Sequence, residues 1–231
     1  MPYIKTQSGI NWFYEIKGKG EIILFIHGWS GDSSNWHIQT EYFKKYFKVF
    51  TIDLPGHGQS SYKKINFDGL TKDIFLLCKK LSLKKINLVG ASFGGMIAIK
   101  FAASYPSILK KLVLVDTNVK FINAQDFKVG MSEAELKKMQ RLMDTDFPNI
   151  LIVFARSLFT EDERGLKNFP HIWQSIISRK TLPQKEALKQ FLIFLEKMDL
   201  RENLANIVIP TLIICGELDS VCPASGSIYL N

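Results

Sequence analysis

The sequence predicts an α/β protein with a mostly parallel, doubly wound sheet into which a helical segment is inserted. Apolar runs typical of buried strands alternate with helical segments between residues 21 and 116. Right-handed crossovers between such strands place helices on both faces of a parallel sheet. One strand ends in Gly90-x-Ser92-x-Gly94, and a helix follows at once. Residues 119–205 then show helical patterns and no comparable strand.

The composition is that of an ordinary globular protein. Of the 231 residues, 46% are hydrophobic and 23% are charged, so the chain can bury a full core. No apolar run reaches the roughly 18 residues of a membrane span, and the N-terminus lacks the apolar core of a signal peptide. We therefore expect a cytoplasmic protein with no membrane partner, most simply a monomer.

The net charge of +8 is scattered along the chain. Residues 119–205 hold 14 basic and 12 acidic residues, and much of the remaining excess stands as lysine pairs at predicted helix ends and strand starts. We therefore expect no nucleic-acid partner. The cysteines at 78, 215 and 222 fit neither a disulfide framework nor a zinc site, and we interpret them as buried thiols. No ligand-spaced cluster suggests a metal or a cofactor.

The strands are predicted from apolar runs and alternation. Residues 3–17 alternate as in an antiparallel hairpin. The continuous run 21–26 indicates a strand covered on both faces and leads to His27-Gly28-Trp29. Another strand, at 47–54, leads to a Pro-Gly-His-Gly-Gln-Ser loop. The strands at 86–89 and 112–116 complete the first part of the sheet.

Three helices are expected between these strands. Asp32 and the two serines after it offer N-caps for the first helix. Its predicted inner face consists of Trp36, Ile38, Tyr42 and Phe43. Residues 70–81 carry apolar side chains at helical spacing, and residues 96–103 after Ser92 alternate small and apolar residues.

A serine at the apex of a strand–turn–helix bend is held in a strained backbone conformation that lifts its hydroxyl above the strand edge. Gly90 and Gly94 carry no Cβ, so the strand and the helix can approach closely. Taken alone, the pattern suits a nucleophile and a glycine-rich turn with an incidental serine equally well.

The segment between the strand at 112–116 and the next strand, at 207–215, is predicted to form a lid over the carboxyl ends of the strands. Patterns typical of capping boxes begin at Ser132 and Thr160, and prolines stand where helices would begin. We assign residues 1–118 and 206–231 to the core and residues 119–205 to the lid. Most apolar lid residues would pack with one another, and Phe154 is a candidate for an acyl pocket.

Four motifs follow one another along the chain. They are His27-Gly28-Trp29, the loop Asp53–Ser60, the Gly-x-Ser-x-Gly around Ser92, and Gly216-Glu-Leu-Asp219 before a proline. In this order they resemble the α/β-hydrolase superfamily, along essentially the whole chain. The chain is similar to carboxylesterases, above all to the pimeloyl-acyl carrier protein methyl ester esterases of biotin synthesis.

The resemblance implies a serine hydrolase. Ser92 would form an acyl-enzyme, and Asp219 would orient a histidine and stabilise its charged form. The backbone amides of Trp29 and Phe93 would form the oxyanion hole. Trp29 and Phe154 would bind the acyl group. The substrate would be a small acyl ester, and an acyl carrier protein is the macromolecular partner that the resemblance suggests.

The family's histidine, which follows the acid, has no counterpart here. His27, His37, His57 and His171 all precede Asp219, and His57 is a poor substitute in its Gly-His-Gly turn. We therefore expect a C-terminally truncated hydrolase that lacks its final strand and helix. We also expect an exposed edge at the strand 212–215, and turnover close to abolished.

Alternatives remain open at this point. The lid offers basic residues for an acidic carrier, namely Arg141, Arg156, Arg164, Lys167 and Arg179. Its net charge of +2 argues against strong steering. A generic short-acyl esterase is the next hypothesis. These motifs do not distinguish an esterase from a thioesterase, a peptidase, a carbon–carbon hydrolase or an acyltransferase. Outside enzymes, the chain could be a non-catalytic ligand-binding module on this fold, or an inactive truncated product.

Overall fold

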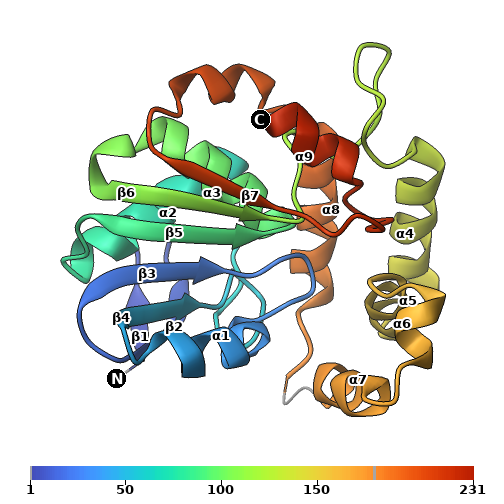
Figure 1. Cartoon of the computed structure of the whole chain (residues 1–231), viewed down its shortest axis with the longest axis horizontal. Helices are drawn as coiled ribbons and strands as arrows, with labels where there is room; N and C mark the ends of the chain where they lie inside the picture. The colour runs from blue at the N-terminus through green and yellow to red at the C-terminus, as the bar shows by residue number, and fades with distance from the viewer. Residues whose placement is uncertain (1, 179–180) are drawn as a thin grey trace.

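The fold is built on a single mixed sheet. In this computed structural model, which describes residues 2–178 and 181–231, seven strands are ordered β1-β2-β4-β3-β5-β6-β7 (Figure 1). Strands β1 and β2 pair antiparallel, as do β2 and β4, and the remaining neighbours are parallel. The strands are β1 (Tyr3–Lys5), β2 (Asn11–Lys17), β3 (Glu21–Ile26), β4 (Phe47–Ile52), β5 (Ile86–Ala91), β6 (Leu109–Val115) and β7 (Thr211–Ile214). The predicted fold class is confirmed.

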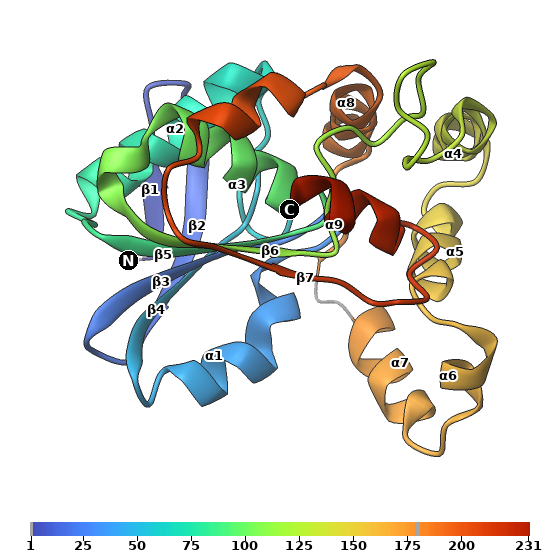
Figure 2. The same cartoon turned by 45° about the horizontal axis from the view of Figure 1, so that its top comes forward.

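Helices cover both faces of the sheet. Figure 2 shows α1 on one face and α2 and α3 on the other. Because successive residues of a strand point to opposite faces, Ile23 and Phe25 pack toward α1, whereas Leu24 and Ile26 join the larger core. The helices are α1 (His37–Phe43), α2 (Phe67–Lys80), α3 (Phe93–Ser104), α4 (Glu133–Thr145), α5 (Asn149–Ser157), α6 (Glu161–Gly165), α7 (Phe169–Ile177), α8 (Lys185–Lys197) and α9 (Ala224–Leu230).

The inserted segment lies at the carboxyl ends of the parallel strands. The arrowheads of β3, β5, β6 and β7 point toward α4–α7 in Figures 1 and 2. The expected capping boxes are present at Ser132 and Thr160, where each hydroxyl accepts from the amide three residues on. Residues 119–131 depart from the all-helical prediction. They form a hairpin-like loop with bridges Ile122–Met131 and Ala124–Phe127.

The predicted inner face of the first helix is correct for Trp36 and Phe43, which pack against the sheet, and wrong for Ile38 and Tyr42. Ile38 is 77% exposed and Tyr42 is 57% exposed, whereas Trp36 and Thr40 are buried. A 3-10 turn (Ser33–Trp36) capped by Asp32 precedes α1. A stripe that contains residues 36 and 40 therefore faces the sheet, and at about 100° per residue this turns positions 38 and 42 toward solvent.

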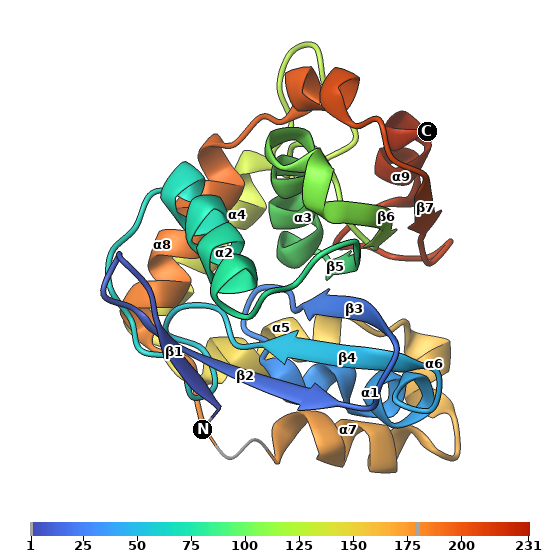
Figure 3. The ribbon, with the colours of Figure 1, turned by 90° about the vertical axis from the view of Figure 1, so that its left-hand side faces the viewer.

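Strand β7 lies at one edge of the sheet, opposite β1 at the other edge (Figure 3). Among the described residues it pairs with β6 alone, and Leu212 is 56% exposed, so the expected exposed edge is present. Cys78 and Cys222 are buried, but Cys215, directly after β7, is exposed. The prediction of buried thiols is therefore wrong for Cys215, because the edge position leaves the end of β7 uncovered.

No helix of the described residues is long and apolar enough to cross a membrane.

Candidate active site

Ser92 occupies a sharp bend between β5 and α3. Its backbone has φ of +51° and ψ of −121°, a strained conformation for a residue with a side chain. A Cβ at Gly90 would lie 2.4 Å from the carbonyl oxygen of Gly94, and one at Gly94 would lie 2.5 Å from that of His27. Both glycines are therefore required, because no side chain fits between the strand, the helix and the end of β3.

Neighbouring strands hold the bend in place. The amide of Ser92 donates to Val115 O at 2.9 Å, and Thr117 Oγ1 donates to Ser92 O at 2.6 Å. A Cβ at Gly28 would lie 3.1 Å from Ser92 Cβ, so the loop after β3 passes directly against the serine. The tips of β3, β5 and β6 thus meet at Ser92.

Two backbone amides beside Ser92 are available as donors. Phe93 is the first residue of α3, and the first amides of a helix have no partner inside it. Trp29 follows Gly28 in the loop against the serine. Across residues 2–178 and 181–231, neither amide donates to a protein acceptor. Both amides therefore remain available to a group bound beside Ser92.

Asp219 lies in the loop after β7, and its carboxylate organises that loop. Its Oδ1 accepts from the amides of Val221 at 2.7 Å and Cys222 at 2.8 Å. The side chain is half-buried. The loop that carries the predicted acid therefore also brings Cys222 to the serine.

Asp116, at the end of β6, is a second carboxylate in this region that the sequence reasoning missed. Its Oδ1 accepts from the Gly216 amide at 2.8 Å, and its φ is +42°. Burial raises the pKa of Asp116, the Gly216 amide opposes this shift, and the negative charge of Asp219 adds to it. An aspartate directly after a buried strand was the available sequence signal.

Cys222 contributes a sulfur neighbour to the candidate nucleophile. Its Sγ lies 4.0 Å from Ser92 Oγ, at the outer limit for a thiol donating to a hydroxyl. Burial raises the pKa of the Cys222 thiol, the Asp219 carboxylate raises it further, and contact with Ser92 partly opposes the shift. The thiol therefore stays protonated at neutral pH, a poor nucleophile and a weak donor.

Ser92 opens into an apolar pocket that also holds both predicted acyl-binding residues. The Trp29 and Phe154 rings meet edge to face at 4.8 Å between centroids, and Trp29 Nε1 donates to Leu188 O at 3.2 Å. These contacts join the loop after β3 to α5 and α8. The pocket is narrow, and the space of about 360 Å³ between its walls includes open solvent at its mouth. Its lining is Trp29, Ser92, Phe121, Ile122, Met131, Leu136, Met139, Phe154, Leu192, Leu195 and Val221.

The four histidines lie in the loops after β3 and β4 and on helices α1 and α7. Leu54 N donates to His27 Nε2 at 2.9 Å, and His27 Nδ1 lies 2.8 Å from Gly28 O. His57 Nδ1 lies 3.0 Å from Pro55 O, and its ring stacks on Phe191. His37 and His171 are exposed, on α1 and α7. Among the described residues, those that line the pocket include no histidine.

This combination of fold and site defines a class of protein. The model of the alpha/beta hydrolase fold family matches residues 21–231, and the chain belongs to that family. A pimeloyl-[acyl-carrier protein] methyl ester esterase from Wigglesworthia glossinidia brevipalpis is 32% identical over 91% of this chain and 80% of its own length. The protein of the same name from Nitrosospira multiformis is 28% identical over 96% of this chain and 86% of its own.

A solved structure supports the same fold. An esterase from Exiguobacterium antarcticum superposes with a TM-score of 0.87 over 99% of this chain and 85% of its own, at 23% identity. At that identity the likeness concerns the fold alone.

Proposed function

We propose that this protein cleaves a carboxylic ester through an acyl-enzyme on Ser92. The observation that carries the proposal is the strained serine in the lining of an apolar pocket, next to two backbone amides that have no acceptor among the described residues. Membership of the alpha/beta hydrolase fold family supports a hydrolase. The loops after β3, β6 and β7 all approach this residue, which a glycine-rich turn without a function does not require.

The chemistry follows from the positions of these groups. Ser92 Oγ would attack the ester carbonyl carbon, and its proton would pass to a general base. The amides of Trp29 and Phe93 would stabilise the resulting oxyanion until the alcohol leaves with a proton. Water would then attack the acyl-enzyme and release the acid. We give Asp219 the role of orienting the base and assign no base among the described residues, so acylation of Ser92 is the step to measure.

The names of the relatives support a particular substrate, a methyl ester on a pimeloyl chain held by an acyl carrier protein in biotin synthesis. An apolar pocket suits the carbon chain of such a substrate. A generic short-acyl ester would fit as well, and it is the simpler probe. No cofactor enters the proposed chemistry.

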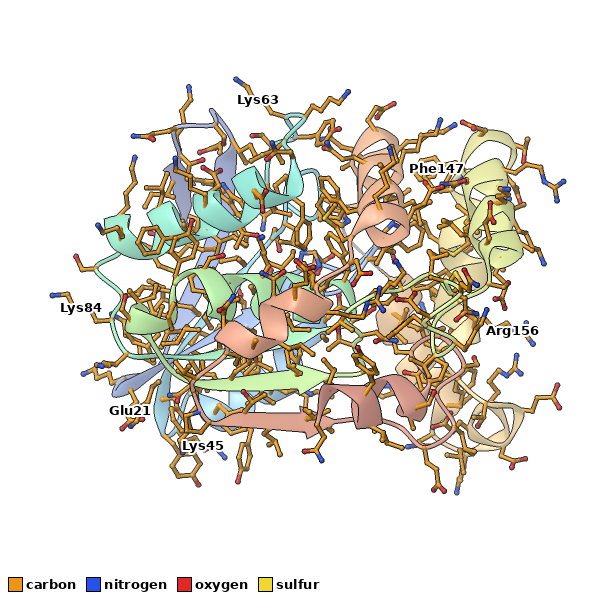
Figure 4. The ribbon with its side chains drawn as sticks, turned by 90° about the horizontal axis from the view of Figure 1, so that it is seen from above. Glu21, Lys45, Lys63, Lys84, Phe147 and Arg156 are labelled. Carbon is orange, nitrogen blue, oxygen red and sulfur yellow. The ribbon has the colours of Figure 1, made fainter. Side chains whose placement is uncertain are left out.

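Two lid arginines support an acidic carrier as partner. Arg141 on α4 and Arg156 on α5 are exposed, and neither pairs with a carboxylate in the described part of the chain. Figure 4 shows Arg156 at the end of the molecule opposite Lys84. Lys167 is also exposed, Arg164 lies 3.9 Å from Glu161, and Arg179 is outside the described residues. Free cations on the lid could hold an acidic protein while its acyl arm enters the pocket.

The division into a core (1–118 and 206–231) and a lid (119–205) belongs to this proposal, as does a cytoplasmic location. Helices α4–α7 lie over the strand ends where Ser92 stands, and α5 and α8 contact Trp29, which is the arrangement a lid would need. A lid would exclude water from the acyl-enzyme and position the chain.

A ligand-binding module is the second candidate. It is favoured by the contacts of Asp219, whose Oδ1 accepts from two amides, and by the absence of histidine from the described part of the pocket lining. Such a module would bind an acyl ligand without acylation of Ser92.

Covalent labelling separates the two. The protein is incubated with an alkyl fluorophosphonate and with p-nitrophenyl hexanoate, and intact mass is followed with time. We expect one adduct on the unmodified protein and on Ser220→Ala, a matched change in the acid loop, and none on Ser92→Ala. Labelling that persists in Ser92→Ala, or no labelling at all, overturns the proposal; acyl-ligand binding without labelling favours the module.

A further inference from the structure

Both backbone polar groups of Ser92 are bound by the carboxyl end of β6 and the loop after it. The Ser92 amide donates to Val115 O at 2.9 Å, and the Ser92 carbonyl oxygen accepts from Thr117 Oγ1 at 2.6 Å. The same oxygen accepts from the amides of Gly95 at 2.9 Å and Met96 at 3.2 Å, in the first turn of α3. It would therefore keep two donors without the Thr117 hydroxyl, so this hydroxyl is not needed to satisfy it.

The surrounding structure holds Thr117 in this position. The residue is 2% exposed, and Asp116 directly before it turns the chain out of β6 with a φ of +42°. A Cβ at Gly95 would lie 2.5 Å from Thr117 Cβ, so the first turn of α3 packs closely on the threonine. Because a β-branched side chain has few rotamers and this one is tightly packed, the hydroxyl has little freedom to leave the Ser92 carbonyl.

The Ser92 carbonyl and the Phe93 amide belong to one peptide group. This group is trans, so its C=O and its N–H point in opposite directions. A hydroxyl that holds the carbonyl toward Thr117 therefore holds the Phe93 N–H toward the amino end of α3, where it has no acceptor among the described residues. A hydrogen bond to the carbonyl also polarises the peptide group, which makes its N–H a stronger donor.

We infer that Thr117 is a positioning residue for the reaction at Ser92, because its hydroxyl orients the Phe93 amide that binds the oxyanion. The inference rests on the proposed function and adds to it a residue outside the four sequence motifs. A donor stabilises an oxyanion best when its direction is fixed before the charge develops. Since removal of one such donor costs about 10²–10³ in rate, loss of its orientation should cost about tenfold.

Two esters of one acid separate this role from simple packing: p-nitrophenyl hexanoate and its thiono analogue, in which sulfur replaces the carbonyl oxygen. Sulfur accepts hydrogen bonds weakly, so the thiono ester gains less from the Phe93 amide. The readout is the rate of the single-equivalent p-nitrophenol burst at saturating ester, with the Ser92→Ala rate subtracted and the acyl-enzyme mass confirmed. Thr117→Val keeps the shape of the side chain without its hydroxyl. It should slow the hexanoate burst about tenfold or more and the thiono burst less than about threefold, with the half-saturating ester concentration unchanged.

Two further variants serve as controls. Thr117→Ser keeps the hydroxyl and should react within about threefold of the unsubstituted protein with both esters. Thr71→Val removes another buried threonine hydroxyl, which donates to Phe67 O at 3.0 Å within α2, and should leave both burst rates unchanged. Circular dichroism establishes that the variants are folded. If Thr117→Val misfolds, Thr117→Ala takes its place with the same expected ratio between the esters.

The outcomes distinguish the inference from the proposed function. Equal slowing of the two esters in Thr117→Val would show a packing role and overturns the inference. A hexanoate burst within about threefold of that of the unsubstituted protein also overturns it, as does a loss in Thr117→Ser as large as in Thr117→Val. Each of these results leaves the proposed function standing. Failure of the unsubstituted protein to form an acyl-enzyme on Ser92 with either ester overturns both.

Discussion

Cys222 Sγ lies 4.0 Å from Ser92 Oγ, while the amide of the same cysteine donates to Asp219 Oδ1 at 2.8 Å. One residue thus touches both the candidate nucleophile and the candidate acid. Its side chain is 3% exposed, which distinguishes it from Cys215, on the same segment but exposed. This difference leads directly to a prediction about thiol reactivity.

We expect native protein to react with N-ethylmaleimide quickly at Cys215 only. Burial raises the pKa of the Cys78 thiol to about 12 and raises that of Cys222 as well, so neither supplies thiolate at pH 8. Intact mass should show one fast adduct in buffer and three in guanidinium chloride. Cys215→Ser should abolish the fast adduct. A fast second adduct on native protein would show that the contact of Cys222 with Ser92 opens readily.

The ionised carboxylate of Asp116 should lower the free energy of unfolding at neutral pH. Its pKa is raised in the folded protein, so the unfolded chain ionises more readily. The loss in free energy of unfolding is therefore complete at pH values above the pKa of Asp116 in the folded protein. It disappears below the pKa of the unfolded chain, near 4. Asp116→Asn keeps an acceptor for the Gly216 amide without the charge. It should stabilise the protein at pH 7 by less than about 1 kcal/mol, and this gain should shrink toward pH 4.

Urea unfolding at pH 7 and pH 4 measures this difference. Asp116→Ala is the matched control, because it removes both the charge and the acceptor for Gly216 N. It should be less stable than Asp116→Asn by about 1 kcal/mol at both pH values. A stabilisation by Asn that does not change with pH would mean that charge is not its cause.

Much of the fold followed from patterns that are local in the sequence. The strands and capping boxes depend on periodicity and on residues three apart, so both were predictable. The outward positions of Ile38 and Tyr42 were not, because they depend on how α1 is rotated against the sheet after the 3-10 turn. The loop 119–131 was missed because its few bridges leave no long alternation to recognise.

The residues of the candidate site were also predictable only in part. Ser92 and Trp29 were assigned from motifs and Phe154 from its position in the predicted lid, and all three line one pocket. Asp116 and Cys222 were not assigned, because their places depend on how the ends of β6 and β7 lie beside β5. A sequence shows which loops reach one edge of a sheet, whereas contact between particular side chains depends on register and loop conformation.

The pair of Asp199 with Arg201 should make stability fall in acid. Hydrogen bonding to the Arg201 guanidinium is the main cause that lowers the pKa of Asp199 to about 2. Because this pKa is depressed, the stabilisation is present above the unfolded value near 4 and is lost as the pH falls through about 2. Asp199→Asn should cost about 1–2 kcal/mol at pH 7, allowing for partial exposure, and almost nothing at pH 2.

Asp126 provides the comparison for that measurement. It contacts the same Arg201, but its side chain is 67% exposed, against 30% for Asp199. Asp126→Asn should therefore cost less than Asp199→Asn in urea titrations at pH 7, because solvent screens the more exposed pair. Equal losses for the two variants would show that exposure does not set the strength of these pairs.

The close packing at Gly94 offers the most direct test of how the bend is held. A Cβ there would lie 2.5 Å from the carbonyl oxygens of both Ile26 and His27, atoms of the central strand that cannot move cheaply. We expect Gly94→Ala to destabilise the protein by about 2–3 kcal/mol and to slow fluorophosphonate labelling of Ser92, since α3 must shift from β3 and carry the Phe93 amide with it. Gly165→Ala is the matched change, at a helical glycine with nothing within 4 Å, and should be neutral or stabilising by up to about 1 kcal/mol. Urea unfolding and labelling rates report the two effects separately. A Gly94→Ala protein that matches the parent in both would mean that close contact with β3 does not hold the bend at Ser92.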